Sequence, residues 1–177
     1  FPGLRFSGDD RWLVYTRTIN NTNQVYLYDL FSTTNVLISR SFDGGVPAFG
    51  SSDSPDVSPD GRFIAYRSYA SNIVPGDTNE ASDIFVYDRA SGTTTLLTGN
   101  YSGTASANQS SLHPVFTDNG RTIIFQTWAS DLIPKNFHET ENIVAYQIEF
   151  SGSTPSFSVQ VVVNASHKTK VIWPVAP

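Results

Sequence analysis

The sequence lacks cysteine and methionine and carries little charge. Without cysteine it can form no disulfide, no thiolate metal site and no cysteine nucleophile. Only 15% of its 177 residues are charged, and 16 Asp and Glu outnumber 11 Lys and Arg. No basic patch is present to hold a phosphate backbone, so we expect no nucleic-acid partner.

Long apolar runs are also missing. No stretch approaches the roughly 18 uncharged apolar residues that a bilayer span requires, so we expect no membrane insertion. Nothing resembles a signal peptide, and a chain that begins at Phe1 without methionine is expected to be the processed or truncated part of a longer product. Richness in Ser, Thr, Asn, Gly and aromatic residues is typical of secreted bacterial β proteins. It predicts an extracellular, cell-surface or periplasmic location.

What the sequence does contain is an internal repeat. The segment 55–87 recurs 59 positions later without a gap, as the matched pairs Pro55/Pro114, Gly61/Gly120, Arg62/Arg121, Ala70/Ala129 and Tyr87/Tyr146 show. A third copy lies upstream, where residues 6–11 align with 57–62 and residues 25–29 align with 84–88. One loop of this first copy is therefore shorter. A fixed period predicts stacked or radially arranged units that bury their apolar faces only against neighbours.

Each repeat has the pattern of β-strands. Apolar residues alternate or form short blocks, without helical spacing, which predicts an all-β fold. Asp60-Gly61 and Asn119-Gly120 favour a two-residue hairpin turn with positive φ angles, and Asp9-Asp10 takes that place in the first copy. After the turns, strands are expected at 11–17, 62–68 and 121–127, then at 24–29, 83–88 and 142–147, and then at 35–39 and 94–98. Gly- and Ser-rich linkers should end at Pro55 and Pro114, just before the next first strand.

The turn and the strands after it resemble a known family. Ser58-Pro59-Asp60-Gly61-Arg62, followed by an apolar strand and one that ends in Tyr87-Asp88, resembles the WD40-like β-propeller repeats of the TolB type. The resemblance covers about residues 4–150, and residues 71–88 resemble a subgroup common in large exported bacterial proteins. Copies one and three lack the turn proline, and Gln147 replaces the aspartate. The resemblance implies an all-β fold with three four-stranded antiparallel blades of a partial β-propeller, plus a C-terminal β tail.

The predicted units are blade 1 at 1–55, blade 2 at 56–114 and blade 3 at 115–163. Residues 157–163 are expected to form the last strand of blade 3. Residues 164–177 would form a C-terminal strand or the start of a following β-sandwich domain. Propellers typically close with four to eight blades, so three leave apolar faces and strand edges uncovered. We therefore expect a protein partner, either further blades of the same chain or identical subunits in a closed oligomer or a filament.

Few residues suggest ligand chemistry. Asp77, Asn79 and Asp83 place oxygen atoms along the loop between the second and third strands of the second copy, which makes them a candidate calcium site. The alternative is an Asx-turn network in which Asp77 and Asn79 bond nearby backbone N–H groups and Asp83 starts a strand. His113, His138 and His167 share no ligand spacing, and no G-x-S-x-G elbow exposes a serine. Trp12 and Trp128 are candidate carbohydrate platforms, with core or edge packing as the alternative.

Two classes of function remain open. The first is a non-catalytic scaffold or interaction module of an exported bacterial protein, completed by further blades or by self-assembly. The second is a fragment of a propeller-bearing enzyme, such as a polysaccharide lyase or a peptidase, whose active site lies elsewhere. We favour the first because the sequence contains repeats and no recognisable catalytic constellation. A propeller hosts unrelated activities, so the fold alone does not decide.

Overall fold

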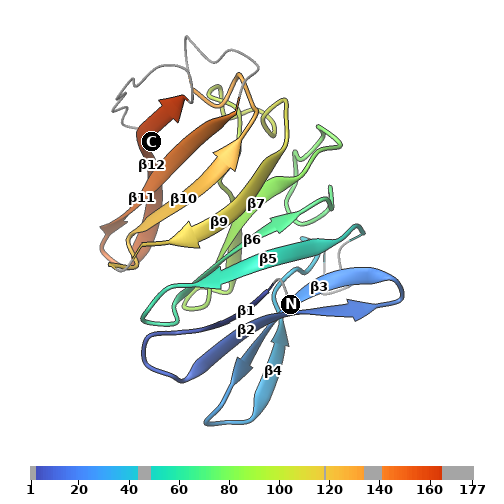
Figure 1. Cartoon of the computed structure of the whole chain (residues 1–177), viewed down its shortest axis with the longest axis vertical. Helices are drawn as coiled ribbons and strands as arrows, with labels where there is room; N and C mark the ends of the chain where they lie inside the picture. Colours follow the sequence, from blue (N-terminus) through green and yellow to red (C-terminus); the bar gives the residue numbers. More distant parts are fainter. Residues whose placement is uncertain (1–2, 44–48, 118, 134–140, 165–177) are drawn as a thin grey trace.

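The computed structural model describes residues 3–43, 49–117, 119–133 and 141–164, with side chains up to residue 159. Within these residues the chain forms twelve strands in three four-stranded sheets (Figure 1). Blade 1 contains β1 (Leu4–Phe6), β2 (Trp12–Ile19), β3 (Thr22–Asp29) and β4 (Thr34–Leu37). Blade 2 contains β5 (Ser52–Val57), β6 (Phe63–Ser68), β7 (Asp83–Asp88) and β8 (Thr93–Leu96). Blade 3 contains β9 (Ser111–Phe116), β10 (Thr122–Thr127), β11 (Asn142–Ser151) and β12 (Thr154–Asn164).

Each sheet is an antiparallel meander in which consecutive strands pair. The first strands β1, β5 and β9 contact one another in that order and form the inner edge of an arc of three blades (Figure 1). This arrangement confirms the predicted all-β partial propeller. Among the described residues no helix offers the length and apolar character for crossing a bilayer.

The turn between the first two strands differs from the prediction. The Gly61 N–H donates to the Ser58 carbonyl at 2.8 Å, and the Asp10 N–H donates to the Ser7 carbonyl at 3.1 Å. Only the last turn residue has a positive φ, at 55° for Asp10, 68° for Gly61 and 64° for Gly120, whereas Asp60 does not. The loop is therefore a longer turn with a left-handed final residue, and the predicted two-residue hairpin is wrong.

Two prolines lie inside strands and not before them. Pro55 belongs to β5 and Pro114 to β9, and each follows a residue with positive φ, Ser54 at 50° and His113 at 53°. The strand pairing shifts register at both places, so each proline lies in a β-bulge, where its missing N–H leaves the ladder intact. The predicted boundaries at 55/56 and 114/115 consequently fall inside strands, and the sheets begin at Ser52 and Ser111.

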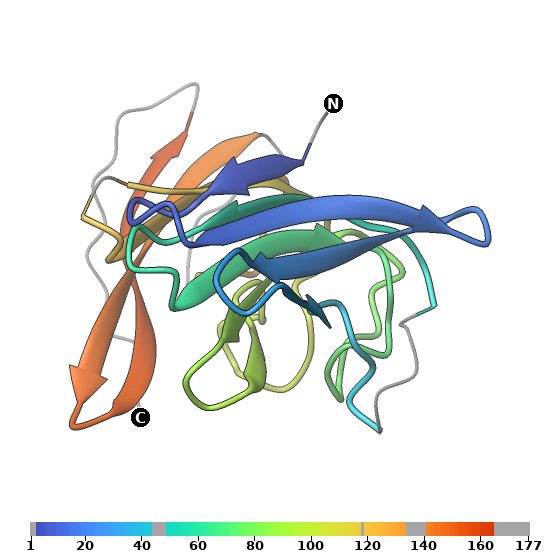
Figure 2. The same ribbon diagram turned by 90° about the horizontal axis from the view of Figure 1, so that it is seen from below.

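The third blade ends in a long hairpin of β11 and β12, visible at the lower left of Figure 2. β12 includes the 157–163 run, as predicted for the last strand of blade 3, while the predicted strand near residues 169–173 lies outside the described residues. The hairpin reaches back onto blade 2. Phe150 and Phe157 place their rings 6.0 and 6.5 Å from the Phe63 ring, and the Arg62 Nη2 donates to the Ser153 carbonyl at 3.0 Å.

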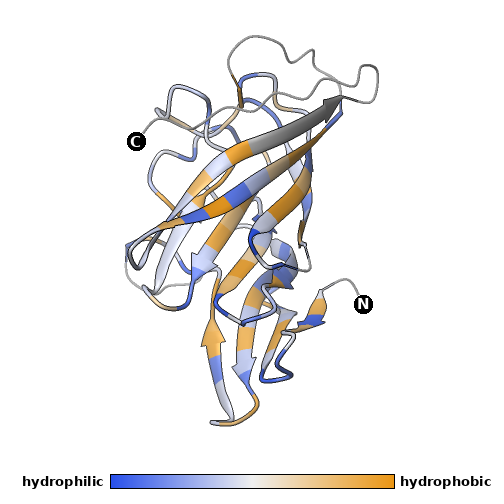
Figure 3. Ribbon diagram, turned by 90° about the vertical axis from the view of Figure 1, so that its left-hand side faces the viewer, coloured by the Kyte–Doolittle hydropathy of each residue, from blue (hydrophilic) through white to orange (hydrophobic). Residues whose placement is uncertain are grey.

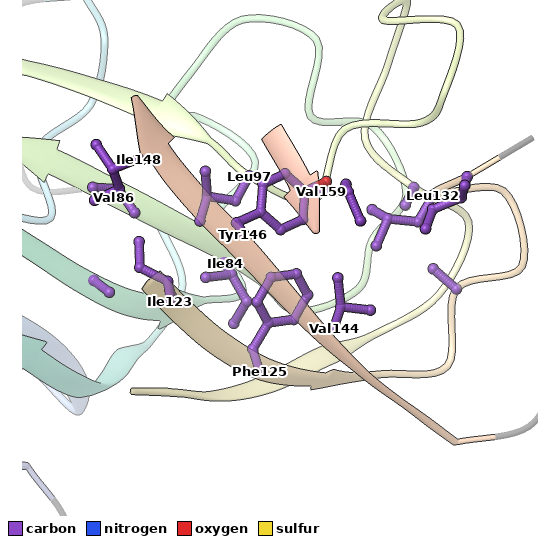
Figure 4. Close-up of a cluster of buried hydrophobic side chains, with 14 of the residues drawn as sticks. Ile84, Val86, Leu97, Ile123, Phe125, Leu132, Val144, Tyr146, Ile148 and Val159 are labelled. Atoms are coloured by element: carbon purple, nitrogen blue, oxygen red, sulfur yellow. The ribbon is translucent and has the colours of Figure 1, made fainter. Parts of the chain in front are cut away.

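The core lies between blades and not within them. Successive side chains point to opposite faces of a sheet, and β6 and β7 carry apolar residues on both faces (Figure 3), so blade 2 is buried on both sides. One cluster joins blade 1 to blade 2 and contains Trp12, Val14, Val25, Leu27, Ile64, Tyr66 and Phe85. The other joins blade 2 to blade 3 (Figure 4) and contains Phe63, Ala65, Ile84, Val86, Ile123, Phe125, Val144 and Tyr146.

Candidate functional site

The turn arginine of blades 1 and 2 is paired with the aspartate that ends the third strand. Arg62 donates from Nε and Nη2 to the two Asp88 carboxylate oxygens at 2.9 and 3.0 Å, and Arg11 contacts Asp29 in the same way at 3.2 and 2.8 Å. The Arg11 guanidinium holds the pKa of Asp29 well below its usual range. These forked ion pairs tie each turn to its sheet, which is a structural role.

Sequence reasoning missed these pairs. The only signal was that Arg and Asp occur together in the first two copies, whereas the third copy has Arg121 with Gln147. There Gln147 accepts from the Thr122 hydroxyl at 3.1 Å, and the Arg121 guanidinium lies 4.4 Å from the centre of the Phe150 ring. A charge pair has thus been exchanged for a cation–π contact with the long hairpin.

The predicted calcium residues of blade 2 do come together. Asp77 is 6% exposed and Asp83 is fully buried at the start of β7. The Asn79 Nδ2 donates to Asp83 Oδ2 at 2.9 Å and to the Ala107 carbonyl at 2.6 Å, while the Thr98 hydroxyl donates to Asp83 Oδ1 at 2.5 Å. Asp77 lies close enough to Asp83 for each carboxyl group to shift the pKa of the other.

Burial decides the charge of this pair. Burial raises the pKa of Asp83 to about 7, and the neighbouring Asp77 carboxylate adds to the rise. Burial also raises the pKa of Asp77. Two buried carboxyl groups that lie close together disfavour each other's negative charge, so Asp83 keeps its proton to a higher pH than an ordinary aspartate.

The other two copies explain why a proton is needed. Gln24 and Asn142 occupy the position of Asp83, and both are buried. The Ser39 hydroxyl donates to Gln24 Oε1 at 2.5 Å, as Thr98 does to Asp83. The start of the third strand therefore accommodates a neutral hydrogen-bonding group, and Asp83 provides one when it is protonated.

The same geometry bears on the metal hypothesis. Calcium takes six to eight oxygen ligands, yet Asn79 directs its NH₂ group toward Asp83 and uses its oxygen to accept from the Ala81 N–H at 2.8 Å. In the part of the chain that the structure describes, no group of three or more His, Cys, Asp or Glu side chains could hold a metal ion. The Asx turn of Asn79, which belongs to the expected alternative, is present. Calcium binding stays a prediction.

The remaining predicted residues are dispersed. Trp12 is only 7% exposed, with the Arg89 guanidinium 4.0 Å from its ring centre, so its ring has no open face for a sugar. Trp128 is half-buried, and His113 is exposed within the β9 bulge. His138 and His167 lie outside the described residues.

The most prominent exposed feature is an apolar surface on blade 1, which we call the aromatic end face. Strand pairing places its residues on one side of the sheet, and the Tyr15 and Tyr26 rings stack there at 5.8 Å. Leu4 and Phe6 are 48% and 51% exposed. The other members are half-buried, and the whole face consists of Leu4, Phe6, Leu13, Tyr15, Tyr26 and Tyr28.

Blade 2 shows what this face becomes when it is covered. Its equivalent residues Ile64, Tyr66 and Phe85 are fully buried, and the Tyr66 and Phe85 rings stack at 5.7 Å with the same 24° tilt as Tyr15 and Tyr26. They pack against the opposite side of blade 1, formed by Trp12, Val14, Val25 and Leu27. The aromatic end face is therefore an uncovered copy of a surface that the next blade buries.

The other end of the arc carries the complementary surface, which we call the outer face of blade 3. Ile124, Ile143 and Ala145 are the equivalents of Val14, Val25 and Leu27, which blade 2 covers in blade 1. Here Ile143 is 41% exposed and the neighbouring Val115 is 45% exposed. Among the described residues, the arc thus ends in two different exposed faces that match the two sides of an inter-blade contact.

Comparison with known proteins supports the fold. No protein-family profile and no curated protein matches the sequence. A putative TolB from Agrobacterium tumefaciens is similar in structure, with a TM-score of 0.50 and 18% identity over 89% of this chain and 49% of that chain. The tricorn protease is similar with a TM-score of 0.52 and 17% identity, over 81% of this chain and 13% of that chain. The chain therefore has a TolB-like β-propeller fold and spans half or less of these structures.

Proposed function

We propose that this chain is a non-catalytic interaction module of an exported bacterial protein, a propeller arc whose end faces are completed by other propeller-type sheets. The observation that carries the proposal is the aromatic end face of blade 1, which repeats a surface that blades 2 and 3 bury. Such a role needs only surface complementarity. The Ser-, Thr- and Asn-rich composition and the resemblance to exported repeats support the location.

The energetics favour completion. Full burial of a large apolar side chain contributes roughly 1.5–3 kcal/mol relative to its exposed state. Ile64, Tyr66 and Phe85 in blade 2 gain this in full, whereas their half-buried counterparts in blade 1 gain only part of it. A sheet that covered the aromatic end face would recover the difference. A contiguous exposed apolar face of this kind is typical of an interaction site.

The likeness to the tricorn protease supports one alternative. This chain covers 13% of that protein, so it would correspond to the propeller portion of a longer peptidase whose active site lies in other sequence. The end faces would then be covered by neighbouring blades of the same polypeptide.

A four-blade fusion tests whether the aromatic end face accepts a blade. Residues 52–110 are placed directly before Phe1, because Ser52 aligns with Phe1 in the repeat. The added sheet should raise the thermal midpoint and protect Tyr15 and Tyr26 from oxidative surface labelling. The matched control carries Val86→Lys in the added copy alone, which places a charge in the new contact.

If the tyrosines stay as reactive in the fusion as in the parent chain, and the added blade melts separately at lower temperature, the proposed function is wrong. Export is tested separately by fractionating the bacterium that makes the protein. Recovery from the cytoplasm alone would contradict it.

A further inference from the structure

We infer that the aromatic end face of one copy binds the outer face of blade 3 of a second copy, head to tail, with Arg17 opposite Glu141. This rests on the proposed function, since it names the sheet that covers the face. Two copies joined in this way at both ends would form a ring of six blades, within the usual range of four to eight.

The two contacts inside the chain are the template. In each, an aromatic-type face packs on the aliphatic side of the preceding blade. Tyr66 and Phe85 pack on Val14 and Leu27, and the stacked Phe125 and Tyr146 pack on the equivalent side of blade 2. Neither contact joins two faces of the same type. The free aromatic end face therefore calls for an aliphatic partner, which the outer face of blade 3 in a second copy supplies, as in a heterologous interface.

Charge supports the same pairing. Arg17 is exposed and lies on the same side of β2 as Leu13 and Tyr15, so the aromatic end face carries a positive charge. Glu141 directly precedes β11 and Glu149 lies on it, and both fall on the same side of the strand as Ile143 and Ala145, which is the outer face. The β10 residues on that face are Thr122, Ile124 and Gln126, which are neutral. Opposite charges on two facing surfaces favour their association and fix its register.

The two charges also lie at matching heights. Arg17 pairs with Gln24, and Glu141 directly precedes Asn142, the blade 3 equivalent of Gln24. Both residues therefore lie at the end of their sheets that is farther from the turn between the first two strands. The Gln126 Nε2 donates to Glu141 Oε1 at 2.6 Å and holds that carboxylate over the outer face.

Charge reversal provides the test. Sedimentation velocity over a concentration series compares the full chain with Arg17→Glu, Glu141→Arg and the double variant. We expect the parent chain to associate and each single variant to bind at least about tenfold more weakly, because it places like charges together. The double variant should restore association. Glu80→Arg, an exposed glutamate in the blade 2 loop, makes the same charge change away from both faces and should leave association unchanged.

A species of fixed size that contains two chains would indicate the closed ring, and a species that grows with concentration would indicate the same contact in an open filament. A parent chain that stays monomeric throughout the series overturns the inference, as does association that neither single variant weakens. The four-blade fusion remains an independent test. If the fusion buries its tyrosines while the parent chain stays monomeric, the face accepts a blade but not one from a second copy.

Discussion

Replacement of Asp83 by asparagine should change how stability depends on pH. Asp83 has a pKa of about 7 in the folded chain against 3.8 for an ordinary aspartate, because it is buried beside Asp77. Between these pH values the folded chain holds a proton that the unfolded chain has released. Its free energy of unfolding therefore falls as pH rises, by about 4 kcal/mol across the whole window. Below pH 3.8 the contribution is fully present, and above pH 7 it is lost.

Asp83→Asn should remove this loss of stability at high pH, because an amide carries no proton to release. The new side chain keeps an oxygen for the Thr98 hydroxyl, as Gln24 does for the Ser39 hydroxyl in blade 1. It gives up the bond from Asn79, at a cost of about 1 kcal/mol. We expect the variant to be about 3 kcal/mol more stable than the parent at pH 8 and about 1 kcal/mol less stable near pH 4.

Urea unfolding at intervals from pH 4 to 8 measures the difference directly. Asp60→Asn is the matched control, because Asn119 fills that place in blade 3 and accepts the same two hydrogen bonds. The stability gained as pH rises is expected for Asp83→Asn, and the control shows whether that gain is specific to position 83. A difference between Asp83→Asn and the parent that stays constant over this range would refute the raised pKa of Asp83.

Three further outcomes follow from the structure. Gly61→Ala should lower the free energy of unfolding, measured with urea, by well over the ~1 kcal/mol expected for Gly92→Ala. Both glycines have a positive φ, but only at Gly61 would an added Cβ meet another side chain, the ring of Trp12 at 2.1 Å. Arg62→Ala should lower the free energy of unfolding by about 2 kcal/mol, and Arg11→Ala should lower it less, because Arg62 is more buried. Equal losses of stability in the two variants would contradict this. Millimolar calcium at pH 8 should leave the thermal midpoint unchanged, and heat released in calorimetry would instead support the metal site.

The sequence predicted those parts of the fold that depend on local pattern. Strands such as Asp83–Asp88 follow from alternation and nearby turn residues, so the three sheets and their order could be anticipated. The turn type could not, because Asp60-Gly61 suits both a two-residue hairpin and the longer turn. Pro55 was placed before its strand because a bulge is defined only by the partner strand, whose register shift the sequence does not reveal.

The candidate sites, too, could be predicted only where they depend on local sequence. The grouping of Asp77, Asn79 and Asp83 could be expected because they share one loop, but their burial comes from Thr98, Ser106 and Ala107, which lie in other segments. Whether a carboxylate serves as a ligand or keeps a proton depends on that burial. The aromatic end face was foreseen only in general terms, since which side of blade 1 stays open depends on the direction in which the blades follow one another.

Both buried clusters found among the described residues include blade 2, because β6 directs Ile64 and Tyr66 to one side and Phe63 and Ala65 to the other. The first and last blades each have one neighbour, so either can fray while the other two stay assembled, but the middle sheet opens only when both of its contacts are lost. Amide hydrogens of β6 and β7 should thus exchange with solvent more slowly than those of β2 or β10. On heating, the end blades would then unfold before the central blade, which would be the last to lose its structure.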